Sequence, residues 1–253
     1  MMEQLKFAGH AVLPGLFAPA EVADLRDELT AALRRPGAVG AMATAAGLYG
    51  ARNVLELFPR AATLWRRPPL TEVLAEVLGG RFGLVRVLFF DKPPEQTWAL
   101  PWHKDWAIAV RENHLPSERF SRPTTKAGVP HVEAPLEVLE AMLTVRLHLD
   151  DVTDENGPLR VFPGSHRSGK EEQLAGNPVT IHAAAGDALL MRPLLLHCSN
   201  RSHPATTRHR RILHFEFAAS PELPDGYEWH TFVAHDPPVA HAPASPTPPS
   251  LVR

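Results

Sequence analysis

Four histidines in this chain are each followed, two residues later, by an acidic residue. Residues i and i+2 of an extended chain project to the same side, so each pair could offer an imidazole and a carboxylate to one metal ion. Two histidines and one carboxylate on one face of an ion, with the other positions open, form the ligand set of non-haem iron(II). With 14 histidines and 28 acidic residues, more than one such pair is expected by chance. The pairs are His103 with Asp105, His131 with Glu133, His148 with Asp150 and His214 with Glu216.

Position along the chain separates these pairs. Those of His148 and His214 lie in apolar strand patterns, where an inward polar pair more often makes structural hydrogen bonds. The pair of His131 lies in an irregular segment that would position a metal poorly. His103 and Asp105 lie in TWALPWHKDWAIAV, where an aromatic-rich strand meets a loop, as at the mouth of a barrel. We therefore predict that His103 and Asp105 are two metal ligands.

The third predicted ligand is His197, which ends the run DALLMRPLLLH. A histidine there could simply cap a strand. However, the polar segment NRSHPATTRHR and the strand RILHFEF follow it, and a returning strand would bring an arginine near His197. Arginine binds a carboxylate through two parallel hydrogen bonds. A 2-oxo acid with a second carboxylate, such as 2-oxoglutarate, would suit a site with both iron and arginine.

The elements that must position these residues change character along the chain. Apolar residues at helical spacing predict helices over 21–35 and 70–78, each ended by glycine or proline-glycine. From residue 82 onward, short β-rich runs are separated by Gly, Pro, Asn and Asp. This order predicts a mainly β fold with flanking helices, an antiparallel sandwich or jelly roll.

The chain of 253 residues is expected to form one domain over residues 1–235. Residues 111–140 are charged and proline-broken, which predicts an insertion that acts as a lid or binding loop. The segment 236–253 is proline-rich and of low complexity, so we expect a disordered tail.

Composition excludes several classes of protein. The net charge of −2 argues against binding to nucleic acid or to an anionic membrane. No apolar run approaches the roughly 18–20 residues that span a bilayer, and the first residues do not look like a signal peptide. The single cysteine, Cys198, cannot form an internal disulfide and fits a cytoplasmic protein. The expected partner is a small molecule; the sequence specifies no oligomeric state.

Longer stretches resemble a known family. LHLDDVTDENGPLRVFPGSHRSG, followed by GDALLMRPLLLHCSNRS and RRILHFEF, resembles the phytanoyl-CoA dioxygenase family, and GHAVLPGLFAPAEVADLRDEL is similar to its opening segment. The resemblance covers residues 7–219. It implies a double-stranded β-helix, a cupin-like jelly roll, that uses Fe(II), 2-oxoglutarate and O2.

The resemblance also implies residue roles. On its pattern His103, Asp105 and His197 are the iron ligands, and an arginine of the last core strand holds the distal carboxylate of 2-oxoglutarate. Arg210 matches this arginine best, and Arg208, on the same face of an extended chain, is the alternative.

The implied reaction is hydroxylation of a C–H bond of a small molecule, with release of succinate and CO2. Asp105 would occupy the position that a halide takes in related halogenating enzymes, so hydroxylation is favoured. No motif selects among the acyl-CoA thioesters, small osmolytes and natural-product intermediates on which family members act.

Five residues are candidates for substrate contacts. Arg146 and His148 stand in the strand LTVRLHLDD, where apolar residues would be expected, and could bind an acidic substrate or the cosubstrate, or pair with acids. Lys126 and His131 belong to the insertion that could close over the substrate. Trp102 could line the pocket or pack in the core, as could its neighbour Trp106.

Two other functions remain open at this stage. One is a non-catalytic jelly-roll module that binds a metal or ligand. The other is a zinc hydrolase, because two histidines and an aspartate also bind zinc. The arginine at the start of the last strand, and the lack of a general base beside the three ligands, count against the hydrolase.

Overall fold

The structure is a computed structural model that describes residues 1–44, 47–94, 96–172 and 176–235. The proline-rich segment 236–253, expected to be disordered, lies outside the described residues. Within the described residues, no helix has the length and apolar character needed to cross a membrane.

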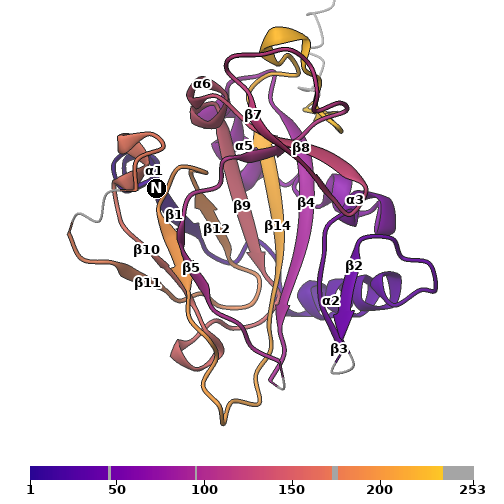
Figure 1. Cartoon of the computed structure of the whole chain (residues 1–253). Coiled ribbons are helices and arrows are strands. Elements are labelled where there is room, and N and C mark those ends of the chain that lie inside the picture. Colours follow the sequence, from indigo (N-terminus) through magenta and orange to yellow (C-terminus); the bar gives the residue numbers. More distant parts are fainter. Residues whose placement is uncertain (45–46, 95, 173–175, 236–253) are drawn as a thin grey trace, which may run out of the picture.

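The helices lie mainly in the first third of the chain (Figure 1). The two predicted from periodicity begin two residues earlier than expected, each at a proline in the first turn, where the missing N–H costs nothing. The α-helices of the described residues are α1 (Met2–Ala8), α2 (Pro19–Leu33), α3 (Val54–Leu57), α4 (Ala61–Leu64), α5 (Pro68–Leu78) and α6 (Leu136–Glu140). Short 3-10 turns occur at Asp154–Asn156, Ser165–Ser168 and Pro224–Gly226.

The main sheet is antiparallel and runs in the order β1-β12-β9-β14-β4-β3-β2, with β15 also paired to β4. Its long central strands β9, β14 and β4 stand side by side in Figure 1. Its members are β1 (His10–Leu13), β2 (Ala41–Thr44), β3 (Gly47–Ala51), β4 (Gly83–Lys92), β9 (Met142–His148), β12 (Ala188–Met191), β14 (Arg210–Ala218) and β15 (Val233–Ala234).

A smaller antiparallel sheet of order β11-β10-β13-β5 forms the second layer, and a cavity lined from both sheets lies between them. Its strands are β5 (Leu100–His103), β10 (Leu159–Val161), β11 (Val179–Ile181) and β13 (His197–Ser199). Three further strands, β6 (Ala107–Ala109), β7 (Ser121–Lys126) and β8 (Val129–Glu133), form a third sheet of order β6-β8-β7. The predicted mainly β fold with flanking helices, the double-stranded β-helix, is confirmed.

Alternation along the central strands divides the main sheet into an apolar face and a polar face. Leu143, Val145 and Leu147 of β9 pack in one core with Leu29 of α2 and Leu74 of α5. The residues between them, including Arg146, therefore face the other layer and the cavity. The same alternation in β4 and β14 brings Arg86, His214 and Glu216 to the inner wall of the sandwich, beside the apolar Leu88 and Phe90.

The segment DALLMRPLLLH, predicted as one run, is divided between the two sheets. β12 ends at Met191 and pairs with β9 of the main sheet, whereas β13 begins at His197 and pairs with β5 and β10. Pro193 lies in the turn between them, which Leu195 N closes by donating to Arg192 O at 3.0 Å. This crossing places His197 in the layer opposite Arg210.

Residues 111–140 are more regular than predicted. They contain β7, β8 and α6, and a cluster of buried apolar side chains holds them to the rest of the fold. Phe120, Val132 and Leu139 of the segment pack there with Val85 of β4 and Trp229. The prediction of an irregular segment was wrong because the strands β7 and β8 are short and contain prolines, so neither shows a clear strand pattern in the sequence. Its role as a lid remains a prediction.

Candidate metal centre and cosubstrate pocket

The three predicted ligands come together at the edge of the cavity. His103 ends β5 and His197 begins β13, and the two residues are directly opposed in the antiparallel pairing of these strands. Asp105 follows in the loop, where its backbone N donates to Pro193 O at 2.9 Å. One ligand atom from each of the three side chains lies within 4.8 Å of the others.

Backbone hydrogen bonds orient both imidazoles. Nδ1 of His103 lies 2.8 Å from Pro101 O, and Nδ1 of His197 lies 2.8 Å from Leu195 O. A carbonyl can only accept, so Nδ1 carries the proton in both rings and Nε2 keeps its lone pair. The two Nε2 atoms face Asp105, at 3.8 Å and 3.7 Å from its carboxylate oxygens.

Local electrostatics favour the protonation states that a metal requires. Burial lowers the pKa of His197 to about 4, so its ring is neutral at pH 7. Burial alone would raise the pKa of Asp105, but the nearby His197, His214, His103 and Arg146 hold it below its ordinary value. Neutral imidazoles and an ionised carboxylate are the forms that bind metal. The donor set fits iron(II), since both Nε2 lone pairs and the carboxylate converge on one point with the cavity open beside it.

The cavity has a volume of about 410 Å³, enough for small molecules but rich in charge. Its ionisable lining includes more basic than acidic side chains. The basic ones are Arg52, Arg86, Lys104, Lys126, Arg146 and Arg210; the carboxylates are Asp105, Glu133 and Glu216; and His103, His197 and His214 complete the set.

Two buried cations lie side by side at one end of the inner wall. Arg210 opens β14 directly opposite Lys92, the last residue of β4. The Arg210 guanidinium donates to Gly157 O at 2.7 Å, while its Nε has no partner. Nζ of Lys92 donates to Ser199 Oγ at 3.0 Å and to Asn200 O at 2.6 Å.

These two cations need an anion. Among the described residues, neither has a carboxylate within ion-pair distance. Burial, with the neighbouring Arg210 second, lowers the pKa of Lys92 to about 6, and burial lowers the pKa of Arg210 to about 9. At pH 7 the Lys92 amine is therefore mostly neutral without a ligand, whereas Arg210 stays charged, and a buried charge without a partner is costly. The distal carboxylate of 2-oxoglutarate would supply the missing charge, so this end of the cavity fits the cosubstrate.

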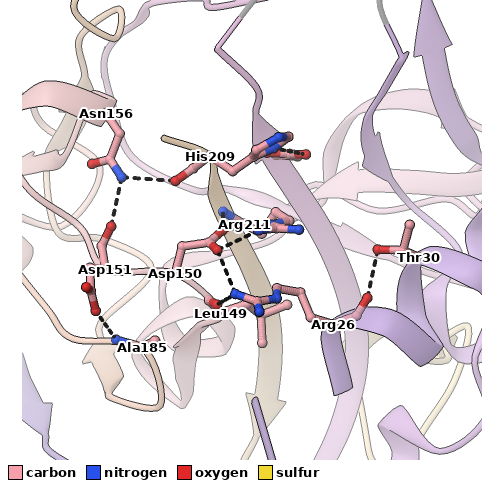
Figure 2. Close-up of polar contacts among 10 residues, drawn as sticks. Arg26, Thr30, Leu149, Asp150, Asp151, Asn156, Ala185, His209 and Arg211 are labelled. Carbon is pink, nitrogen blue, oxygen red and sulfur yellow. Dashed lines mark hydrogen bonds and ion pairs between the residues drawn. The ribbon is translucent and has the colours of Figure 1, made fainter. Parts of the chain in front are cut away.

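The residues on either side of Arg210 hold the start of β14 from the outer face (Figure 2). Arg211 makes two side-chain hydrogen bonds to Asp150, at 2.8 and 2.7 Å, and Asp150 also contacts Arg26 at 3.3 Å. His209 lies 3.0 Å from a carboxylate oxygen of Asp91. Because side chains alternate along a strand, anchoring 209 and 211 outward aims residue 210 inward.

The other predicted residues divide between the cavity and its surroundings. Arg146 lines the cavity, and its NH1 lies 3.1 Å from Nδ1 of His214. Lys126 also lines it. His148 is buried on the same face of β9 as Arg146, with neither ring nitrogen partnered, but it does not line the cavity. Arg208 lies at the surface, 3.6 Å from Glu155.

Two more candidates lie away from the cavity. His131 is buried in β8 beside a separate space of about 40 Å³. Trp102 packs against Phe162, with ring centroids 4.5 Å apart, whereas Trp106 lines the cavity.

Comparison with known proteins places this site in a family. The model of the phytanoyl-CoA dioxygenase family (PhyH) matches residues 5–212. The chain belongs to this family. The family lies within the superfamily of Fe(II)- and 2-oxoglutarate-dependent oxygenases.

An L-proline trans-4-hydroxylase from Streptomyces griseoviridis is 30% identical over 172 residues, which cover 66% of this chain and 54% of that enzyme. The match therefore spans about half the length of this relative.

Solved structures share the fold at lower identity. Iron-bound EctD from S. alaskensis aligns with a TM-score of 0.65 and 21% identity, covering 85% of this chain and 74% of its own. The α-ketoglutarate-dependent epimerase SnoN from nogalamycin biosynthesis aligns with a TM-score of 0.62 and 18% identity, over 88% and 84% of the two chains. These likenesses establish the double-stranded β-helix of this member of the family.

Several residues of the cavity were not predicted as site residues. They are Arg52, Arg86, Trp98, Glu133, His214 and Glu216, and Lys92, which lies opposite Arg210, was not predicted either. The strand VRVLFFDK carries a signal for two of them, because Arg86 and Lys92 share a face with Leu88 and Phe90. When charged residues recur on one face of an otherwise apolar strand, that face is expected to point into a cavity inside the barrel rather than to solvent.

Proposed function

We propose that this protein is an Fe(II)- and 2-oxoglutarate-dependent oxygenase that hydroxylates a C–H bond of a small molecule. His103, Asp105 and His197 would be the iron ligands. One observation carries the proposal: two imidazole Nε2 atoms and one carboxylate converge at the edge of a cavity that is also lined by the buried Arg210, whose Nε has no partner.

Arg210 would bind the distal carboxylate of 2-oxoglutarate, with Lys92 beside it. The unpartnered Nε of Arg210, and the absence among the described residues of a carboxylate within ion-pair distance of it, support this role. The hydrogen bond from Arg210 to Gly157 O fixes the guanidinium plane. Arg208, the alternative at the sequence level, lies at the surface beside Glu155 and has no equivalent support.

Bound iron, with 2-oxoglutarate and O2, would supply the oxidising power to exchange a substrate C–H for C–OH, giving succinate and CO2 as by-products. The chain would position the reactants and exclude side reactions. Asp105 would keep one iron position occupied by carboxylate, which favours hydroxylation over halogenation. Leu88 and Phe90, from the wall of β4, and Trp106 would limit water beside the reacting carbon.

A screen of succinate release over a metabolite library, with iron(II), 2-oxoglutarate and O2, tests this proposal. The expected result is turnover with at least one compound whose product has gained one oxygen atom by mass. Tight iron and 2-oxoglutarate binding without turnover of any compound would favour a non-catalytic binding module. Iron-independent hydrolysis supported by zinc would favour a zinc hydrolase.

A further inference from the structure

A second group of basic side chains lies at the other end of the cavity, and the proposed function leaves it unexplained. Arg52 follows β3, Arg86 lies on β4 and Lys126 ends β7, and all three line the cavity. We call them the basic cluster. They come from three separate segments of the chain, so their convergence is a property of the fold.

The basic cluster lies far from the cosubstrate end. Along β4, Lys92 is opposite Arg210, Leu88 is opposite His214, and Arg86 is opposite Glu216. Lys92 and Arg86 are six residues apart on one strand, a separation of about 20 Å. A five-carbon diacid held at Arg210 and chelated to iron cannot also reach Arg86, so the two basic ends would bind different groups.

Few carboxylates neutralise the basic cluster. Glu216 lies 3.5 Å from Arg86 and is shared with His214 at 3.6 Å. In the described parts of the chain, Arg52 and Lys126 have no carboxylate within ion-pair distance and their side chains make no hydrogen bond to protein. Burial, and after it the charge of Arg86, lowers the pKa of both groups.

Loading the cofactors would not remove this excess of positive charge. Iron(II) carries two positive charges and 2-oxoglutarate two negative ones, so together they leave the balance of the cavity unchanged. Grouped like charges in a partly dry space destabilise each other. A protein that keeps three such basic side chains at this end of its cavity is suited to a ligand that brings an anion there.

We propose that Arg52, Arg86 and Lys126 form an anion subsite, and that the substrate is a small carboxylic acid whose carboxylate binds there while its reacting C–H group lies beside the metal. This inference rests on the proposed function and specifies its substrate class. The volume of about 410 Å³ must hold 2-oxoglutarate as well, so the acid is small. Glu216, which is opposite Arg86, would accommodate an amino group on such an acid.

Matched pairs of ligands test the class of the substrate. Short-chain carboxylic acids and α-amino acids, each paired with its primary amide, are screened with phosphorylated and CoA-thioester compounds. Binding is followed by thermal shift and succinate release with iron(II) and 2-oxoglutarate. We expect carboxylic acids to bind and turn over, with about 10- to 100-fold weaker binding of each matched amide. Binding of neutral or phosphorylated compounds only, or of no carboxylic acid, overturns the proposal.

Variants test the residues. Arg52→Gln and Lys126→Gln should each weaken binding of the best acid at least about 10-fold, with an unchanged KM for 2-oxoglutarate. Arg111→Gln is the control, since Arg111 belongs to the same insertion but pairs at the surface with Glu228. Equal effects of all three substitutions, or a matched rise in the KM for 2-oxoglutarate, would contradict a substrate subsite.

An additional experiment distinguishes failure of this inference from failure of the proposed function. If the wild-type protein fails to bind iron and 2-oxoglutarate, the proposed function is wrong. Thermal shifts of the metal-free protein with the same acids and amides then still measure the basic cluster. Stabilisation by acids that is lost in Arg52→Gln would support the anion subsite alone, and its absence would overturn it.

Discussion

His103 and His197 face each other directly across the pairing of β5 and β13, with ring centroids 4.2 Å apart. Each ring donates Nδ1–H to the carbonyl two residues earlier, at 2.8 Å in both cases. Two neighbouring strands thus present the same tautomer, held by the same kind of backbone hydrogen bond. Backbone geometry, which is rigid within paired strands, sets this arrangement and prepares both Nε2 atoms for one ion.

Removing any one of the three ligands should abolish iron binding. His103→Ala, Asp105→Ala and His197→Ala are each expected to lose iron and activity and to keep a cooperative fold, because these side chains line a cavity rather than the apolar core. Iron content after desalting and the circular dichroism spectrum provide the measurement. His182→Ala, at an exposed histidine, is the control. If the Asp105→Ala variant kept full iron-dependent activity, the assignment of the ligands would be wrong.

The cosubstrate role of Arg210 predicts a specific loss in Arg210→Lys. Lysine keeps the charge but cannot donate two parallel hydrogen bonds to one carboxylate. Hydrogen bonds between charged groups are worth about 1.5–3 kcal/mol each. The KM for 2-oxoglutarate should therefore rise by one to two orders of magnitude, with unchanged iron affinity. Arg208→Lys should have a much smaller effect. The reverse ranking would transfer the role to Arg208, and negligible effects of both would undermine the cosubstrate pocket.

The contacts on the outer face should matter to the pocket behind them. Asp150→Ala removes the partner of Arg211 and Arg26 (Figure 2). We expect a loss of about 1–3 kcal/mol in the free energy of unfolding, and a several-fold rise in the KM for 2-oxoglutarate because the start of β14 loosens. Asp154→Ala, which removes an exposed carboxylate, is the control. An unchanged KM in a destabilised Asp150→Ala variant would show that the outer contacts do not position Arg210.

The His209–Asp91 pair should make stability depend on pH. Its hydrogen bond to Asp91 raises the pKa of His209 in the folded state. The stabilisation is therefore complete below the unfolded-state pKa of about 6.5 and is lost as pH rises through the raised folded-state value. In urea unfolding, the free energy of unfolding of the wild type should exceed that of His209→Gln by more at about pH 6 than at about pH 9. An equal difference at both values would contradict this pairing.

Residues 111–140 are proposed to close over bound substrate. The side chains of β7 are mostly exposed and this strand is the edge of its sheet, whereas β8 is largely buried. Hydrogen exchange should therefore be fast in β7 without substrate and slow there once a substrate binds, since Lys126 ends that strand. Exchange of β1, at the edge of the main sheet, is the comparison. Unchanged exchange of β7 on adding a turned-over substrate would reject the lid.

The sequence predicted the parts of the fold and the site that depend on local pattern. Helical periodicity located α2 and α5, and the strand-to-loop position of His103 singled out, among four pairs, the one that lies beside His197. The division of DALLMRPLLLH between two sheets was not predictable, because an apolar run does not reveal which sheet its halves join. Nor was the basic cluster, since Arg52, Arg86 and Lys126 converge only through the register of strands far apart in sequence.

The most direct test of the central claim is anaerobic addition of iron(II) and then 2-oxoglutarate to the purified protein, followed by visible absorption. We expect a weak metal-to-ligand charge-transfer band in the wild type, its loss in Asp105→Ala, and its recovery in Arg210→Lys only at much higher 2-oxoglutarate concentration. No band in the wild type at saturating iron and 2-oxoglutarate, or an equal band in Asp105→Ala, would contradict the claim.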